Sequence, residues 1–197
     1  SSENGDAVYA RIAQRLADPS FAPRALFDAF GIEALATTDD PLDDLGDHAA
    51  LAADPSFGGR VMPTFRPDRY LDPEGADFEE AVTALTARAG ATTFAAYLEA
   101  LRARREHFIA HGAVSADHGV AELLTTDLAD DAPAFFDRAL RGNLSPYESQ
   151  LFRGHMLLEM GRMSARDGLV MTIHPGVRRN HHTAAYERFG ADRGHDK

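Results

Sequence analysis

The sequence predicts an α/β protein whose strands run parallel in one sheet. Short apolar runs that suit buried strands alternate along the chain with longer stretches of helical spacing. Each connection between two such runs is long enough for a right-handed crossover. Each run is also followed by ionisable or hydrogen-bonding residues, as strands are at the ligand site of an α/β protein.

Two helices are expected ahead of the first strand. Apolar residues recur at helical spacing over residues 7–17. The second helix begins at Pro23, a residue suited to a first helical turn, and continues to about Phe30. Gly31 then ends it.

Four strands are expected in the remaining chain. Pro63 lies inside the second of them and has no N–H to give to a ladder, which is unfavourable for a strand at this position. In the fourth, Leu169, Val170, Met171 and Ile173 form an apolar run of the kind that suits a strand buried on both faces. The predicted strands are Ile32–Thr37, Arg60–Phe65, Ala113–Ala116 and Leu169–Ile173.

The stretches between these strands predict helices at residues 42–53, 77–89 and 93–111, followed by two more. The last helix has a distinct start, with Ser145 as N-cap, Pro146 at the first position and Glu148 completing a capping box. The apolar residues expected to pack this helix on the sheet are Leu151, Met156 or Phe152, Leu158 and Met163.

Composition restricts the class of protein. A chain of 197 residues can hold one ordinary domain, and 44% apolar with 26% charged residues is typical of globular proteins. No apolar run approaches the roughly 18 residues of a membrane span and no signal peptide is apparent, so we expect a cytoplasmic protein without a membrane partner. The net charge of −11 argues against nucleic acid as a partner. Only Lys197 among 20 basic residues is a lysine, which leaves no candidate for Schiff-base chemistry.

Every predicted strand is followed by side chains that could serve a site. Taken alone, the first group suits a helix cap, the next two suit turns, and the last suits a solvated loop. Parallel strands bring their carboxyl ends to one edge, so four such groups together favour a ligand site. The groups are Thr37, Thr38, Asp39 and Asp40; Arg66, Pro67 and Asp68; Asp117 and His118; and His174 with Arg178, Arg179, Asn180, His181 and His182.

The residue types in these groups narrow the chemistry. His174 could be a metal ligand or a general acid or base. Arg66 and Arg179 carry planar guanidinium groups that suit a carboxylate or phosphate. Asp39, Asp40 and Asp117 could orient His or Arg, or bind sugar hydroxyls. An anionic, hydroxylated small molecule fits this set. The sequence contains no glycine-rich nucleotide motif, P-loop lysine or GxSxG motif.

Four segments of the sequence, in this order, resemble uronate isomerase, the glucuronate and galacturonate isomerase branch of the amidohydrolase superfamily. They are FGIE with ATTDDP at residues 30–33 and 36–41, PTFRPD at 63–68, SADHG at 115–119, and HPG with RN at 174–176 and 179–180. The segment FGAD at residues 189–192 is also similar to that family.

The resemblance implies a (β/α)8 TIM-type barrel that converts D-glucuronate to D-fructuronate, or D-galacturonate to D-tagaturonate, by proton transfer between C1 and C2 through an enediol. It also implies a divalent metal, zinc by preference, with His174 as a ligand from the fifth strand. The implied catalytic residues are His174, Asp117 and His118. The implied substrate-binding residues are Arg66, which would hold the sugar carboxylate, with Arg179, Asn180, Thr38 and Asp39.

The sequence also departs from that family. The His-x-His metal pair of the first strand and the aspartate ligand of the last strand do not occur in it, and the adjacent His181 and His182 cannot replace a pair that faces one side of a strand. A TIM barrel needs about 250 residues. We therefore interpret residues 1–197 as a single partial barrel domain with about strands two to five, whose main metal ligands lie outside the chain. It is expected to be inactive alone and to belong to a homo-oligomeric full-length enzyme.

Two alternatives to an isomerase are compatible with the same residues. One is a metal-dependent hydrolase of the same superfamily. The other is a non-catalytic module that binds sugar acids, in which Arg66 is retained and the metal is lost. Metal analysis and an assay with D-glucuronate on the complete gene product would separate the three.

Overall fold

The computed structural model describes residues 5–176, 181–190 and 193. Contacts between Cα atoms divide the chain into two units, each with its own internal packing. Unit 1 comprises residues 1–37 and 46–62, and unit 2 comprises residues 38–45 and 63–197.

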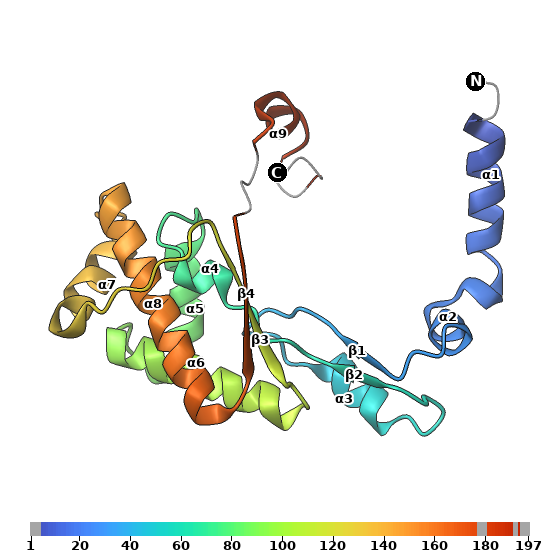
Figure 1. Ribbon diagram of the computed structural model, residues 1–197, viewed down its shortest axis with the longest axis horizontal. Helices are drawn as coiled ribbons and strands as arrows, with labels where there is room; N and C mark the ends of the chain where they lie inside the picture. The colour runs from blue at the N-terminus through green and yellow to red at the C-terminus, as the bar shows by residue number, and fades with distance from the viewer. Residues whose placement is uncertain (1–4, 177–180, 191–192, 194–197) are drawn as a thin grey trace. The chain divides into compact units, whose positions relative to one another are not determined.

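Unit 1 contains a short parallel strand pair preceded by helices. Its elements are α1 (Gly5–Leu16), η2 (Pro19–Phe21), α2 (Pro23–Ala29), β1 (Ala34–Ala36), α3 (Gly46–Ala53) and β2 (Arg60–Met62). The two strands run side by side in Figure 1, with Ala34 opposite Arg60. Phe27 of α2 is buried and its ring centroid lies 4.8 Å from that of Phe57.

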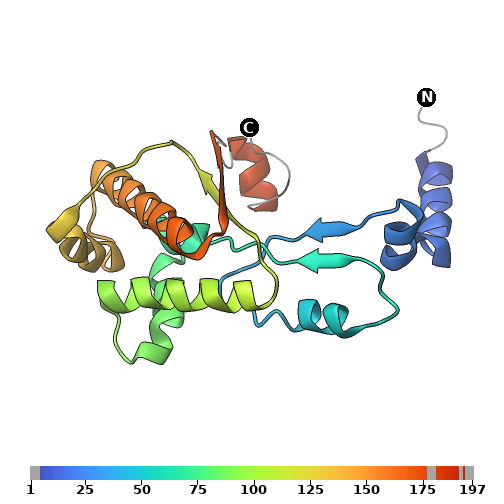
Figure 2. The same ribbon diagram turned by 60° about the horizontal axis from the view of Figure 1, so that its bottom comes forward.

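Unit 2 contains most of the helices and the two longer strands. Its elements are α4 (Asp68–Leu71), α5 (Phe78–Thr86), η3 (Ala87–Ala89), α6 (Phe94–Ala110), β3 (Ser115–Val120), η4 (Ala129–Asp131), α7 (Ala132–Leu140), α8 (Pro146–Asp167), β4 (Val170–Pro175) and α9 (Thr183–Phe189). In Figures 1 and 2 the helices α5 to α8 gather to one side of the β3–β4 pair.

The strands of unit 2 are parallel, as the sequence predicts. β3 and β4 pair in register, with Asp117 opposite Thr172. Single parallel bridges join Asp39 to Phe65 and Phe65 to Ala116. Four chain segments therefore follow one another in the same direction, in sequence order, and the α/β class is confirmed.

An aromatic core holds the helices of unit 2 against the strands. Phe65, on the bridge between strands, packs edge-on against Phe108 of α6 with centroids 5.2 Å apart. Tyr97 of α6 stacks on Phe136 of α7 at 4.9 Å, and both rings are fully buried. The Tyr97 hydroxyl is satisfied because it donates to the Tyr70 carbonyl oxygen at 2.7 Å.

The predicted start of α8 is confirmed in detail. Ser145 and Glu148 form both hydrogen bonds of a capping box, and Pro146 occupies the first turn. The prediction of its packing face is wrong for two positions, since Leu151 and Leu158 are only half-buried. Phe152, Met156, Met160 and Met163 are buried instead, because α8 contacts α4 and α7 as well as β4.

The strand boundaries differ from the prediction. The second strand is predicted over Arg60–Phe65, but its pairing ends at Met62 and resumes only at Phe65, because Pro63 has no N–H to give to the ladder. β3 continues to Val120 and β4 to Pro175, which places Asp117, His118 and His174 inside strands rather than after them.

The prediction that the last strand is buried on both faces is wrong for this chain. Val170 is 63% exposed and Ile173 is 38% exposed. β4 pairs with β3 along one edge, and in the described residues no strand pairs along its other edge. The apolar side chains Val170 and Ile173 of β4 are therefore not fully covered by other elements in the described residues.

The predicted helix over residues 42–53 begins later, at Gly46. Asp40 does not cap it: its Oδ1 accepts a hydrogen bond from the Leu42 N–H at 2.8 Å and one from the Tyr70 hydroxyl at 2.6 Å. Leu45 has a φ of 58°, a left-handed conformation that delays the helix by several residues. None of the helices in the described part of the chain combines the length and apolarity that crossing a bilayer requires.

Candidate active site

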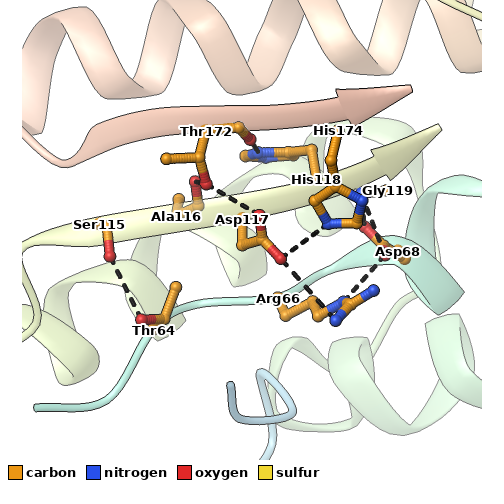
Figure 3. Close-up of polar contacts among 10 residues, drawn as sticks. All are labelled: Thr64, Arg66, Asp68, Ser115, Ala116, Asp117, His118, Gly119, Thr172 and His174. Atoms are coloured by element: carbon orange, nitrogen blue, oxygen red, sulfur yellow. Dashed lines mark hydrogen bonds and ion pairs between the residues drawn. The ribbon is translucent and has the colours of Figure 1, made fainter. Parts of the chain in front are cut away.

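The register of β3 and β4 selects which side chains meet. Successive side chains of a strand point to opposite faces, and residues opposite each other on paired strands point to the same face. Asp117 pairs with Thr172, and Gly119 pairs with His174. These four positions therefore share one face of the strand pair (Figure 3).

A hydrogen-bonded pair of His174 and Asp117 forms the centre of the candidate site. His174 Nε2 lies 2.9 Å from Asp117 Oδ2. The other carboxylate oxygen, Oδ1, accepts a hydrogen bond from the Thr172 hydroxyl at 2.8 Å. Both oxygens of Asp117 are thus engaged, and the carboxylate is fixed relative to the imidazole.

Arg66 approaches this pair from the neighbouring chain segment. Its Nε donates to Asp68 Oδ2 at 3.1 Å, and its Nη1 lies 3.8 Å from Asp117 Oδ2. The guanidinium therefore lies between two carboxylates, as Figure 3 shows. The Arg66 side chain is 31% exposed, so a ligand can reach it.

Gly119 allows these groups to come together. A Cβ at this position would lie 2.9 Å from Asp68 Oδ2, 2.9 Å from His174 Cε1 and 3.4 Å from Arg66 Nη2. The Gly119 N–H also donates to the Asp68 carboxylate, at 3.0 Å from Oδ1 and 3.2 Å from Oδ2. Any larger residue would separate the side chains that meet here.

The environment of Asp117 favours its ionised form. Partial burial by itself would raise the pKa of this carboxyl group. The hydrogen bonds from Thr172 and His174, with the charges of His174 and Arg66, outweigh burial and lower the pKa below its usual value. Asp117 is therefore an anion near neutral pH, able to accept a proton or to stabilise a positive imidazolium.

His118, expected to be catalytic, lies on the opposite face of β3 from Asp117. It is fully buried and its Nδ1 lies 3.2 Å from the Thr172 carbonyl oxygen. Burial lowers the pKa of His118 and outweighs the hydrogen bond to that carbonyl. A neutral imidazole with Nδ1–H as donor fits these surroundings, and the structure does not bring His118 into the His174–Asp117 cluster.

The two residues expected to bind substrate after the first strand, Thr38 and Asp39, differ in their surroundings. Asp39 Oδ2 accepts a hydrogen bond from the Thr64 N–H at 3.2 Å, and the Thr64 hydroxyl lies 3.2 Å from that of Ser115. Thr38 is exposed. Two further residues with expected substrate contacts, Arg179 and Asn180, lie outside the described residues.

Sequence reasoning assigned no site role to three members of the cluster: Asp68, Gly119 and Thr172. The motif containing Asp68 suggested an ordinary turn, whereas its carboxylate joins Arg66 to Gly119. Alternation along β4 could have found Thr172, because it lies two residues before His174 and must share its face. No local signal indicates that Gly119 receives side chains from two other segments.

The described residues do not make a complete metal site. His174 and Asp117 are donors of types that bind divalent cations. In the part of the chain that the structure describes, however, no group of three or more His, Cys, Asp or Glu residues could hold a metal ion. A divalent ion at His174 would need ligands beyond these two.

Fold and site together define an α/β protein with a histidine–carboxylate pair and an accessible arginine on parallel strands, an arrangement suited to proton transfer on an anionic small molecule. A family model described as glucuronate isomerase matches residues 1–197. The chain belongs to the glucuronate isomerase family, which confirms the resemblance stated from its sequence motifs.

Individual relatives agree with this family. The chain is 49% identical over 199 residues to a uronate isomerase of Cutibacterium acnes, covering 100% of this chain and 42% of the relative. It is 49% identical over 197 residues to a uronate isomerase of Corynebacterium glutamicum, covering 98% of this chain and 38% of the relative. The chain thus spans about two fifths of the length of these curated relatives.

Solved structures give the same result. A glucuronate isomerase from Caulobacter crescentus superposes with a TM-score of 0.90 at 42% identity, covering 100% of this chain and 42% of the other. A uronate isomerase from Thermotoga maritima superposes with a TM-score of 0.89 at 28% identity, covering 100% and 44%. These matches favour the isomerase interpretation over the hydrolase and the non-catalytic module.

Proposed function

We propose that the protein containing this chain is a uronate isomerase that interconverts D-glucuronate and D-fructuronate, or D-galacturonate and D-tagaturonate. The observation that carries the proposal is the 2.9 Å contact between His174 Nε2 and Asp117 Oδ2 beside the partly exposed Arg66. Membership of the glucuronate isomerase family supports this assignment. The chain spans about two fifths of the length of its relatives, so the activity is proposed for the whole protein that contains it.

The reaction requires two functions of the site, proton transfer and binding of the sugar carboxylate. An aldose–ketose conversion of this kind moves a proton between C1 and C2 through an enediol, so it needs a group that takes a proton on one carbon and returns it to the other. The His174–Asp117 pair can hold that proton between Nε2 and Oδ2. Arg66 would pair with the sugar carboxylate and fix the distance from that group to C1 and C2.

A divalent metal, with zinc as the first candidate, is a further part of the proposal. Asp68 and Asp117 together carry one more charge than Arg66 balances, so an anionic substrate needs additional positive charge at this place. A bound divalent cation would supply it and would polarise the sugar oxygens. His174 would be a ligand of the ion through Nδ1, the ring nitrogen that does not face Asp117, and the ligands that complete the site would come from other parts of the protein.

The proposal extends to the whole molecule. Its four successive parallel segments suit strands two to five of a (β/α)8 barrel, with residues 1–197 as part of one barrel domain. In the described residues β4 has one unpaired edge, which suits pairing with a further barrel strand, and its exposed apolar side chains suit faces that the rest of a barrel covers. A cytoplasmic homo-oligomer of the amidohydrolase superfamily is the form in which we expect the enzyme to work.

An assay on the full-length protein tests this function. Ketose formation from D-glucuronate and D-galacturonate is measured with a coupled dehydrogenase, beside metal analysis of the purified protein. We expect turnover of at least one uronate, lost on chelation and restored by zinc, and no turnover by the 197-residue chain alone. Absence of turnover by a folded, metal-loaded full-length protein on both uronates would overturn the proposal.

A further inference from the structure

Asp68 occupies a position between the proposed carboxylate-binding arginine and strand β3. Its Oδ2 accepts a hydrogen bond from Arg66 Nε at 3.1 Å. The Gly119 N–H donates to the same carboxylate, at 3.0 Å from Oδ1 and 3.2 Å from Oδ2. Asp68 therefore connects the long, flexible side chain of Arg66 to the backbone of the paired strand β3.

This contact determines which part of the Arg66 guanidinium remains for a ligand. A guanidinium has five N–H donors in one plane, and Asp68 engages the one on Nε. In the described part of the chain neither Nη atom of Arg66 forms a hydrogen bond, and Nη1 is 3.8 Å from Asp117. The donors without a hydrogen-bond partner are those of the Nη1–Nη2 edge, where Asp117 lies within ion-pair distance only, and this edge matches the two oxygens of a carboxylate.

The backbone at Gly119 makes the position of Asp68 specific. A Cβ there would approach Asp68 Oδ2 to 2.9 Å, so only glycine lets the carboxylate lie against this N–H. Asp68 is also the first residue of α4, yet its side chain does not cap that helix and is directed to β3 instead. Stabilisation of α4 therefore does not explain why the Asp68 carboxylate points toward Gly119.

We propose that Asp68 is a positioning residue for substrate binding. Held by the Gly119 N–H, it fixes the plane of the Arg66 guanidinium so that the Nη edge receives the carboxylate of the sugar acid. This inference rests on the proposed function, because it assigns the uronate carboxylate to Arg66. Asp68 itself does not touch the reacting carbon atoms.

Steady-state kinetics of full-length variants with D-glucuronate test the proposal. Asp68→Asn keeps the size of the side chain but has one acceptor oxygen for two donors. We expect KM to rise about tenfold or more, as for a lost hydrogen bond to a charged group, with kcat changed less than about threefold. This split arises because the carboxylate contact is made equally in the ground state and the transition state.

The matched control is Asp77→Asn, which removes the same charge from the exposed Arg69–Asp77 ion pair of 2.9 Å in the same unit. We expect its KM and kcat to equal those of the unmodified enzyme. Asp68→Glu provides a second test if Asp68→Asn fails to fold. It keeps the charge, but the extra methylene shifts the guanidinium, so KM should rise again.

The outcomes separate this inference from the proposed function. Full-length enzyme without activity on either uronate would overturn the function itself. Active enzyme with an unchanged KM in a folded Asp68 variant would overturn the role of Asp68 alone. A fall in kcat at constant KM would also reject it, since that result indicates a role in the chemical step or a general structural one.

Discussion

His174 Nε2 lies 2.9 Å from Asp117 Oδ2, although 57 positions separate the two residues in the chain. The contact follows from the parallel pairing of β3 and β4, which sets Asp117 opposite Thr172, two residues before His174. Thr172 then binds the second oxygen of the same carboxylate. Asp117 thus joins three side-chain partners, His174, Thr172 and Arg66, and its removal should affect the site more than that of any one partner.

Asp117→Asn in the full-length enzyme should therefore reduce kcat. An amide cannot accept a proton or stabilise an imidazolium, so we expect a loss of about a hundredfold or more, the usual range for a general acid–base group. Thr172→Val is the control, since it removes the hydroxyl that donates to Asp117 Oδ1 and to the Ala116 carbonyl oxygen but keeps the carboxylate, and it should cause a smaller loss. Coupled assays at saturating uronate measure both. Asp117→Asn activity close to that of the unmodified enzyme would contradict the assignment.

Arg66→Ala should act mainly on binding. Removing the cation that pairs with a buried carboxylate costs about 2–5 kcal/mol, so KM for D-glucuronate should rise by at least tenfold. Arg24→Ala in unit 1 is a matched control, because Arg24 forms an exposed ion pair of 2.7 Å with Asp54. Its KM should stay unchanged. Equal KM values for the two variants would exclude Arg66 as the carboxylate site.

Gly119→Ala should impair both proton transfer and substrate binding. The added Cβ would approach Asp68 and His174 to 2.9 Å, and neither can withdraw without losing a hydrogen bond of the site. We expect a lower kcat and a higher KM with a nearly unchanged melting temperature. Gly161→Ala is the control, because its Cβ would meet only Met171 Sδ, at 3.8 Å. A Gly119→Ala enzyme with normal kinetics would show that the side chains adapt.

The sequence was sufficient to predict the α/β class and the groups centred on Arg66, Asp117 and His174. These follow from local patterns: apolar runs, their punctuation and the residues near strand ends. The strand face on which each side chain lies could not be predicted as well from the sequence. Asp117 and His118 were expected after a strand, where alternation does not apply, and the structure places both inside β3 on opposite faces.

Other features depend on packing that no local pattern contains. Gly119 receives Asp68 from one segment and His174 from another, so its role is visible only after folding. The exposure of Val170 depends on which elements pack against its face of β4. Leu151 and Leu158 fit a helical stripe, but contacts with two other helices rotate the buried face of α8 toward Phe152 and Met160.

The ion pair between buried Arg105 and partly exposed Asp167 should be a major contributor to stability. Arg105 is fully buried and donates to Asp167 from Nε at 2.6 Å and from Nη2 at 3.0 Å. Asp167→Ala would leave a buried cation unpaired, at a cost of about 3–5 kcal/mol. Adding Arg105→Met removes that cation and should recover most of the loss. Thermal or urea unfolding of the full-length variants measures both, and equal stability of the single and double variants would contradict this account.

His118 should make stability depend on pH. Burial lowers its pKa in the folded state below the ordinary 6.5, and of the charges around it Asp68 and Asp117 oppose this shift while Arg105 adds to it. Below pH 6.5 the unfolded chain therefore binds a proton that the folded chain does not. Stability is at its full value above pH 6.5 and falls as pH decreases toward the lowered pKa.

His118→Asn isolates this contribution, because an amide N–H can still donate to the Thr172 carbonyl oxygen but does not titrate. Burial also lowers the pKa of His107 and His155, but both remain in the variant and affect it equally. Melting temperatures at pH 7.5 and 5.5 should differ less for the variant than for the unmodified protein. An identical decrease in both proteins would mean that His118 is protonated in the folded state as readily as in the unfolded chain.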